Sequence, residues 1–125
     1  VVAGDGATAY WLGEIETAVR LKLPITFVIL NNAGFGWIIQ CERTMNFVTE
    51  STFAPVDFSA IGKAVGADGT RAFSMEEVLS AFKQAATIDS PFVIDVLSSD
   101  VATPTVDYGV ISHQTSPKRG AYGLD

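Results

Sequence analysis

The sequence has few cationic residues, and this scarcity limits the partners that the protein can bind. Eight lysines and arginines stand against fourteen aspartates and glutamates, which gives a formal net charge of −6. A nucleic-acid-binding protein needs a basic face that displaces counterions from the phosphates. The composition therefore predicts that the protein has no nucleic-acid partner.

Cysteine and long apolar runs are also scarce. Cys41 is the only cysteine, which excludes an internal disulfide framework and a metal site built from cysteines. From this we expect a reducing, cytoplasmic setting. No apolar run approaches the roughly 20 residues that cross a bilayer, and no basic-then-apolar signal segment opens the sequence. We expect no membrane association.

Apolar residues are nevertheless abundant enough for a folded core. They make up 48% of 125 residues, a length that fits one domain. Residues 1–3 (Val-Val-Ala) have the pattern of a buried strand already under way, with no initiator methionine before them. We therefore expect an N-terminally incomplete fold, the chain being a piece of a longer protein.

Strand and helix patterns alternate along the chain. Residues 25–30 are apolar without alternation, which is typical of a strand buried on both faces of a parallel sheet. The predicted strands are 1–3, 25–30, 70–73 and 91–96. The predicted helices are 8–22, 57–66 and about 74–86, and residues 33–56 form a connection with a short helix. This alternation predicts an α/β fold, a parallel sheet with helices on both faces.

Capping residues and apolar stripes support the last two helices. Asp57 and Ser74 are suitable N-caps, Ser74 in a capping box, and Gly66 is a suitable helix stop. Gly66-Ala67-Asp68-Gly69 follows a helix and is interpreted as a stop and turn. The residues expected to face inward are Phe58, Ile61 and Val65 on the first of these helices and Val78, Leu79, Phe82 and Ala86 on the second.

Two polar loops follow predicted strands. Gly4-Asp5-Gly6-Ala7-Thr8 comes after the first strand, and Asn31-Asn32-Ala33-Gly34-Phe35-Gly36 comes after the second. In open parallel sheets, ligands bind at the carboxyl ends of the strands. If the two strands are neighbours, both loops face one crevice.

The chemistry of the loops indicates an anion and a cation together. Gly4 and Gly6 allow close approach of the backbone, and a following helix N-terminus favours a phosphate. Asp5 would repel that phosphate unless a divalent cation lay between them. Mg²⁺ prefers about six oxygens, including one or two carboxylates and substrate phosphates. Asp5, the Asn32 amide oxygen and a backbone carbonyl near Gly34 could supply three of them.

The two motifs and their spacing resemble the signature of thiamine-diphosphate (ThDP) enzymes. Gly4-Asp5-Gly6 precedes an amphipathic helix and a buried strand that ends in Asn31-Asn32, and 27 positions separate Asp5 from Asn32. The stretch 13–24 is similar to the acetolactate-synthase-like and benzaldehyde-lyase-like branch. The resemblance continues to about residue 104. It implies that residues 1–103 form the diphosphate-binding (PP) domain and 104–125 a C-terminal tail.

The resemblance also implies cofactors and binding residues. The expected cofactors are ThDP and Mg²⁺, and the full-length enzyme could also hold FAD elsewhere. The implied metal ligands are Asp5, Asn32 and the backbone of Gly34. The expected cofactor-binding residues are Gly4, Asp5, Gly6, Ala7, Thr8, Asn32, Gly34, Phe35 and Gly36.

The implied reaction is C–C bond cleavage or ligation on a 2-oxo acid, 2-hydroxy ketone or 1,2-diketone. Ile38 stands where the pyruvate-decarboxylase branch has a glutamate, which argues against aldehyde release by that route. Trp37 and Ile38 are either an apolar wall beside the substrate or ordinary core residues. Cys41 replaces a tryptophan of the acetohydroxyacid synthases, which argues against a biosynthetic acetolactate synthase.

The family uses an activating glutamate that no residue of this chain matches. The resemblance therefore implies a pyrimidine-binding domain of the same or a partner subunit, in a homodimer or homotetramer that acts on a small molecule. By default, His113 in the tail is a solvated or packed side chain; the alternative is a tail that covers the active site and brings His113 to substrate. Arg43, Lys118 and Arg119 are surface charges by default and candidate ligands of a substrate carboxylate otherwise.

Two other classes of function compete with this interpretation. Gly4-x-Gly6-x-x-Ala9 satisfies the Rossmann dinucleotide pattern, although no acidic residue ends the second predicted strand to hold a ribose. The other competitor is a non-catalytic domain that keeps the ThDP fold and lacks the reaction. Metal-dependent binding of ThDP would exclude the dinucleotide-binding module. Turnover of a substrate would exclude the non-catalytic domain.

Overall fold

A computed structural model describes residues 1–101 of the protein. Its centre is one sheet of four parallel strands in the order β1-β2-β4-β3. The strands are β1 (Val2–Gly4), β2 (Thr26–Asn31), β3 (Asp68–Ala72) and β4 (Phe92–Leu97). The tail 104–125, with His113, Lys118 and Arg119, lies outside the described residues.

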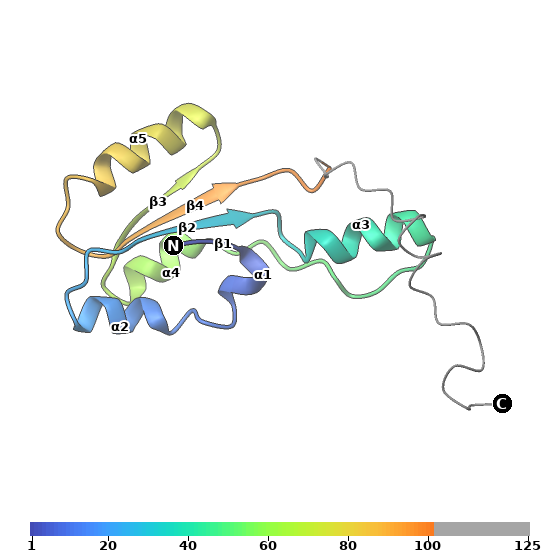
Figure 1. Ribbon diagram of the computed structural model, residues 1–125, viewed down its shortest axis with the longest axis horizontal. Helices are drawn as coiled ribbons and strands as arrows, with labels where there is room; N and C mark the ends of the chain where they lie inside the picture. The colour runs from blue at the N-terminus through green and yellow to red at the C-terminus, as the bar shows by residue number, and fades with distance from the viewer. Residues whose placement is uncertain (102–125) are drawn as a thin grey trace.

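Helices cover both faces of the sheet, as the sequence predicts (Figure 1). Helices α2 (Glu14–Arg20) and α4 (Phe58–Ala64) pack on one face, where they bury Phe27, Ile29 and Val93. Helix α5 (Met75–Ala85) packs on the other. Burying each large apolar side chain contributes about 1.5–3 kcal/mol. The fold class is confirmed.

The predicted helix 8–22 is wrong as a single element. The chain forms a one-turn helix α1 (Asp5–Thr8) and then α2, separated by tight turns. Backbone hydrogen bonds of the i→i+3 type, such as Trp11 N–H to Thr8 O at 3.1 Å, connect the two. These turns place the Trp11 ring on Phe27, with centroids 5.6 Å apart. Packing of the half-buried indole against the core accompanies this break in the helical pattern.

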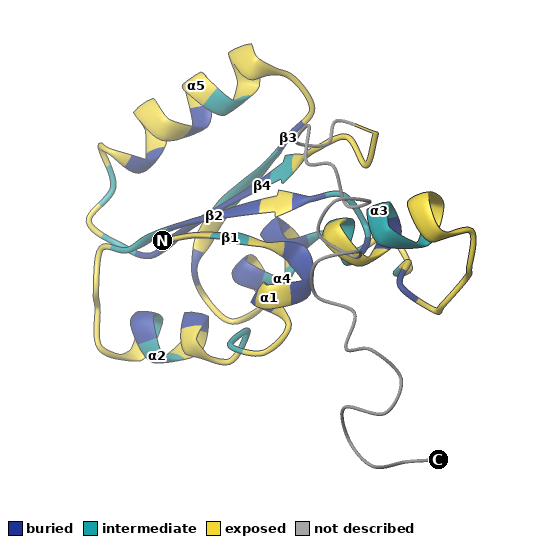
Figure 2. Ribbon diagram, turned by 45° about the vertical axis from the view of Figure 1, so that its right-hand side comes forward, coloured by how far each residue is buried: buried dark blue, intermediate teal, exposed yellow. Residues whose placement is uncertain are grey.

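The inward face predicted for the last helix is also wrong in part. Ala81 and Ala85 are the buried residues of α5, whereas Leu79 and Phe82 are 56% and 44% exposed, so the outer face is largely yellow in Figure 2. Small alanines let the helix approach Phe92 and Ile94 on the sheet closely. On α4 the stripe is likewise shifted: Phe58 and Gly62 are buried and Val65 is 37% exposed.

The N-caps and the helix stop are confirmed, and one turn is not. Asp57 and Ser74 accept hydrogen bonds from Ala60 N–H and Glu77 N–H, and Gly66 has a φ of 98°. Residues 68–69, predicted to be a turn, instead begin β3. A Cβ at Gly69 would lie 2.8 Å from the Val93 carbonyl oxygen, so a glycine there lets the strand approach β4.

The long connection 33–56 contains one helix, α3 (Gly36–Met45), which lies beyond the carboxyl ends of the strands (Figure 1). Its return segment pairs with the loop that follows β2, through an isolated bridge between Gly34 and Thr52. No helix within residues 1–101 has the length and apolarity that a bilayer span requires.

Candidate functional site

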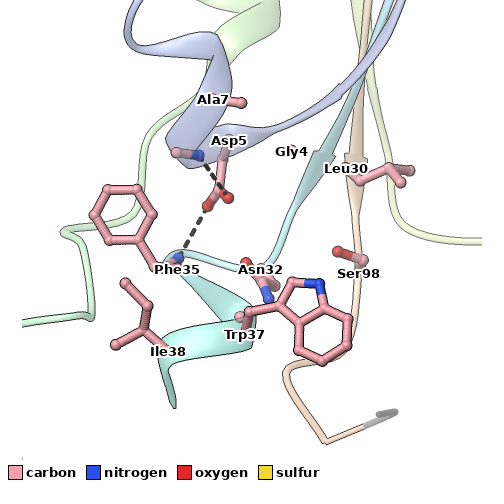
Figure 3. A pocket seen from close by; sticks show the side chains of 12 residues that line it. Gly4, Asp5, Ala7, Leu30, Asn32, Phe35, Trp37, Ile38 and Ser98 are labelled. Atoms are coloured by element: carbon pink, nitrogen blue, oxygen red, sulfur yellow. Dashed lines mark hydrogen bonds between the residues drawn. The ribbon is translucent and has the colours of Figure 1, made fainter. Parts of the chain in front are cut away.

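The two polar loops meet at one edge of the sheet because β1 and β2 are neighbours. The parallel register pairs Gly4 with Leu30, so Asp5 and Asn32 leave adjacent strand ends. The two strands are thus neighbours, which is the condition under which the two loops were expected to face one crevice. The loops border a cavity of about 620 Å³, seen from close by in Figure 3. The residues that line it are Gly4, Asp5, Gly6, Ala7, Leu30, Asn32, Gly34, Phe35, Gly36, Trp37, Ile38 and Ser98.

Asp5 joins the two loops directly. Its side chain is buried, and Oδ1 accepts a hydrogen bond from Gly6 N–H at 2.9 Å while Oδ2 accepts one from Gly34 N–H at 3.0 Å (Figure 3). Because α1 is a single turn, its dipole is weaker than that of the long helix expected from the sequence. The carboxylate therefore dominates the electrostatics of this loop.

Three oxygen atoms converge between the loops. The Asn32 amide oxygen faces Asp5 Oδ1 at 3.3 Å and the Gly34 carbonyl oxygen at 2.8 Å. None of the three is a donor, so they repel one another unless a cation lies between them. The alternative is a half-turn of the amide, after which its nitrogen donates to both oxygens at these distances.

The spacing of the three oxygens fits a small divalent cation. Oxygens at adjacent corners of an octahedral Mg²⁺ site with bonds of about 2.1 Å lie about 3.0 Å apart. The two oxygen–oxygen distances, 2.8 and 3.3 Å, fall on either side of that value. Within residues 1–101 no group of three histidine, cysteine, aspartate or glutamate side chains could hold a metal. A cation here would use one carboxylate, one amide and one backbone carbonyl.

The backbone behind these oxygens is closely packed. A Cβ at Gly34 would lie 2.5 Å from Ile39 Cδ1 and 2.8 Å from the Ser51 carbonyl oxygen. Ala33 has a left-handed φ of 57°, which costs a non-glycine residue about 1–2 kcal/mol. Hydrogen bonds from Phe35 N–H to Ser51 O and from Phe53 N–H to Ala33 O hold this conformation.

The other asparagine, Asn31, belongs to a separate buried polar network. Its Nδ2 donates to Val56 O and to Asp95 Oδ1, both at 2.9 Å, and its Oδ1 accepts from Ala33 N–H at 3.2 Å. Asp95 is fully buried, and its Oδ2 accepts from Phe58 N–H at 3.1 Å. Neither Asp95 nor its link to the loop was predicted from the sequence.

Arg71 supplies the positive charge of this network. Its Nε lies 3.3 Å from Asp95 Oδ2 without hydrogen-bond geometry, and its Nη2 donates to Val56 O at 3.2 Å. Burial raises the pKa of the Asp95 carboxyl, against the opposing effects of Asn31, the Phe58 N–H and Arg71.

The outer wall of the cavity is mostly apolar. Trp37 and Ile38 of α3 are 58% and 44% exposed and line it, so they are not ordinary core residues. Two further lining residues, Leu30 and Ser98, were not predicted from the sequence. Ser98 directly follows β4, a neighbour of β2, so the rule that ligands bind at the carboxyl ends of strands applies to it too.

Three candidates lie elsewhere or have other partners. Thr8 is fully buried, donates its hydroxyl to Gly4 O at 2.9 Å and is not among the cavity-lining residues. Arg43 pairs with Asp100, its Nη2 lying 2.7 Å from Oδ2, as expected for a surface charge. Cys41 is a half-buried free thiol on α3.

This fold and this edge define the chain as a cofactor-binding α/β domain, with ligand loops at the carboxyl ends of parallel strands. Its residues 1–96 match the family described as "Thiamine pyrophosphate enzyme, C-terminal TPP binding domain", thiamine pyrophosphate being another name for ThDP. The chain belongs to that family.

Relatives of known name agree with this assignment. The chain is 30% identical to an acetolactate synthase of Bacillus subtilis (strain 168) over 96 residues, which cover 76% of this chain and 17% of that protein. It is 31% identical over 101 residues to a benzoylformate decarboxylase of Pseudomonas aeruginosa, covering 76% and 18%. The solved benzoylformate decarboxylase of Polynucleobacter necessarius superposes with a TM-score of 0.75 at 26% identity, covering 82% of this chain and 20% of that chain.

The chain thus spans about one fifth of the length of the relatives that it matches. The family match favours ThDP over a dinucleotide, the first alternative considered from the sequence. In agreement, Asn31 and not an acidic residue ends β2.

Proposed function

We propose that this chain binds the diphosphate of ThDP through Mg²⁺, which is held by Asp5, the Asn32 amide oxygen and the Gly34 carbonyl oxygen. The observation that supports this most directly is the close approach of three groups from the two loops: the Asn32 amide lies 3.3 Å from Asp5 Oδ1 and 2.8 Å from the Gly34 carbonyl oxygen, close enough for all three to share one cation. Gly4, Gly6, Ala7, Phe35 and Gly36 line the same cavity and would contact the cofactor.

For the whole protein we propose C–C bond cleavage or ligation on a 2-oxo acid, 2-hydroxy ketone or 1,2-diketone. When bound, the cofactor supplies the electron sink, and the protein supplies position and electrostatics. Trp37 and Ile38 would exclude water from the reacting end, since they form the apolar wall of the cavity. Within residues 1–101 no carboxylate lines the cavity except Asp5, which supports the proposal that an activating glutamate comes from another domain.

The remaining parts of the proposal concern the assembly. A pyrimidine-binding domain, of the same or a partner subunit, would complete the site, which implies a homodimer or homotetramer. Residues 1–103 are proposed as the diphosphate-binding domain and 104–125 as a tail. We propose a cytoplasmic location on the basis of the single cysteine.

The metal assignment is tested with Asp5→Ala in the full-length protein. We expect Mg²⁺-dependent ThDP binding, measured by calorimetry, and turnover of a 2-oxo acid to be lost together, because Asp5 is the one carboxylate among the three proposed metal ligands. Asp68→Ala is the matched control. Asp68 carries the same charge but begins β3, at the opposite end of the sheet. If Asp5→Ala binds ThDP as tightly as wild type, the metal assignment is wrong.

Turnover distinguishes the enzyme from a non-catalytic domain of the same fold. If the full-length wild-type protein binds ThDP with Mg²⁺ yet converts none of the three substrate classes, the proposed reaction is wrong and the proposed binding stands.

A further inference from the structure

We propose that Asp95 is a positioning residue for residues 31–36, the loop that follows β2 and is called the cofactor loop below, and that it acts through Asn31. The proposal rests on the proposed function, because the loop that it would position carries Asn32 and Gly34. Asp95 does not line the cavity and touches no candidate metal ligand. Its effect must therefore be transmitted by the atoms that it contacts.

The first link runs across the sheet, between residues 64 positions apart. Asp95 on β4 pairs in register with Ile29 on β2, so its side chain points to the same face as Ile29 and Asn31. Its Oδ1 accepts the hydrogen bond from Asn31 Nδ2 at 2.9 Å. Because Asp95 is fully buried, no water replaces this bond when it is broken.

The second link runs from Asn31 into the loop. With Nδ2 held by Asp95 and Val56, the amide oxygen of Asn31 is aimed at Ala33 N–H, 3.2 Å away. This hydrogen bond closes a turn over Asn32 and holds Ala33 in its left-handed conformation. The orientation of the Asn32 amide and the Gly34 carbonyl, on either side of Ala33, depends on that turn.

Asp95 also connects the loop to the rest of the domain. Its Oδ2 accepts from Phe58 N–H at the start of α4 and lies 3.3 Å from Arg71 Nε on β3. The Asp95 carboxylate on β4 thus contacts α4, β3 and Asn31, the residue that precedes Asn32. This is how outer partners of metal ligands act, and their mutation typically costs about 10–100-fold in metal affinity.

The test measures Mg²⁺ binding by calorimetry in the full-length protein with ThDP held at saturation. We expect Asp95→Asn and Asn31→Ala each to raise the Kd for Mg²⁺ at least about tenfold. The variant that carries both substitutions should bind Mg²⁺ no more weakly than Asn31→Ala alone, because both changes break the same link from Asp95 through Asn31 to the loop. The matched control is Ile94→Ala. Ile94 is an equally buried neighbour on β4 whose side chain points to the other face, toward α5.

Ile94→Ala should lower the melting temperature and leave the Kd for Mg²⁺ within about twofold, since it changes packing alone. If Asp95→Asn lowers the melting temperature in the same way without changing the Kd, the positioning role is overturned. Should Asp95→Asn yield no folded protein, Asn31→Ala tests the link from its other end, and an unchanged Kd overturns the proposal equally. If wild type itself shows no Mg²⁺-dependent ThDP binding, it is the proposed function that fails.

Discussion

Asn31 and Asn32 are consecutive residues with the same side chain, and the structure gives them opposite surroundings. Every polar atom of the Asn31 side chain has a partner of the opposite kind, in the Val56 carbonyl, Asp95 and the Ala33 N–H. The Asn32 amide instead borders the cavity, 3.3 Å from Asp5 Oδ1 and 2.8 Å from the Gly34 carbonyl oxygen. Asn31 bonds to partners inside the domain, whereas the Asn32 amide lies against the two other proposed metal ligands.

The difference follows from the position of the two residues at the end of a strand. Asn31 is the last residue of β2 and points to the face covered by α2 and α4, where Asp95 is buried. Asn32 is one residue further on and turns into the cavity. Asn31 is buried among partners of the fold, whereas Asn32 is half-buried at the cavity. The contrast therefore separates an asparagine that holds the domain together from one that we propose binds the metal ion.

The largest expected effect comes from exchanging each asparagine for alanine. Asn32→Ala should weaken Mg²⁺ binding by more than about 100-fold, above the range for outer partners, because a ligand is removed. It should change the free energy of unfolding by about 1 kcal/mol or less. Asn31→Ala should instead cost about 3 kcal/mol, since it leaves buried Asp95 Oδ1 without its donor.

The measurements for this pair are Mg²⁺ calorimetry in the full-length protein and hydrogen exchange of the β4 amides, which reports the local free energy of unfolding. Equal losses of stability in the two variants would contradict the contrast between the asparagines. So would an unchanged Kd for Mg²⁺ in Asn32→Ala.

A smaller effect is expected from Gly34→Ala, which tests the close packing of the backbone that carries Asn32 and Gly34. The added Cβ would meet Ile39 Cδ1 at 2.5 Å and the Ser51 carbonyl oxygen at 2.8 Å. Overpacking of this kind costs about 1–3 kcal/mol and should also displace the Gly34 carbonyl oxygen. We expect a lower melting temperature and a raised Kd for Mg²⁺.

Gly13→Ala is the matched control for that substitution. A Cβ at Gly13 meets nothing within 4 Å, and its φ of −63° suits alanine. The change should raise stability by about 0.4–1 kcal/mol, through the unfolded state. If Gly34→Ala and Gly13→Ala shift the melting temperature by the same amount, close packing is not the reason that position 34 excludes a side chain.

The smallest expected effect concerns pH and the segment that backs the cofactor loop. Hydrogen bonds from the side chains of Thr49 and Ser51 lower the pKa of Glu42. A lowered folded-state pKa stabilises the fold above the ordinary value and loses that contribution as pH falls through the lowered value. Exchange of amides 49–53, corrected for intrinsic rates, should therefore quicken as pH drops through that window.

Glu42→Gln sharpens this measurement, because its amide does not titrate in that range. In the variant, the same amides should be less protected at neutral pH, and the acid-dependent step should vanish. A step that persists in Glu42→Gln would assign it to another carboxyl group.

Some features of the fold and the site could be predicted from the sequence, and others could not. The buried central strands β2 and β4, the N-caps and the polar loops after β1 and β2 were found from sequence, because each rests on local pattern or residue chemistry. Residues 1–3 were also expected to be buried, but Val2 of the edge strand β1 is 68% exposed. The break between α1 and α2 was missed because it depends on Trp11 stacking on Phe27. The inward face of α5 was missed because the sheet selects small residues where Phe92 and Ile94 protrude.

The sequence by itself determined which chemical groups stand at the strand ends and how far apart they are along the chain. This is because a run of apolar residues is buried as a strand, and the polar residues that follow it mark where the strand ends. Only the tertiary structure decided that β1 and β2 lie side by side, and that Asn31 turns toward Asp95 while Asn32 turns toward Asp5. Partners 64 positions apart meet through sheet order and register, and adjacent residues point to opposite faces of a strand. Those are properties of the assembled sheet, which no local pattern contains.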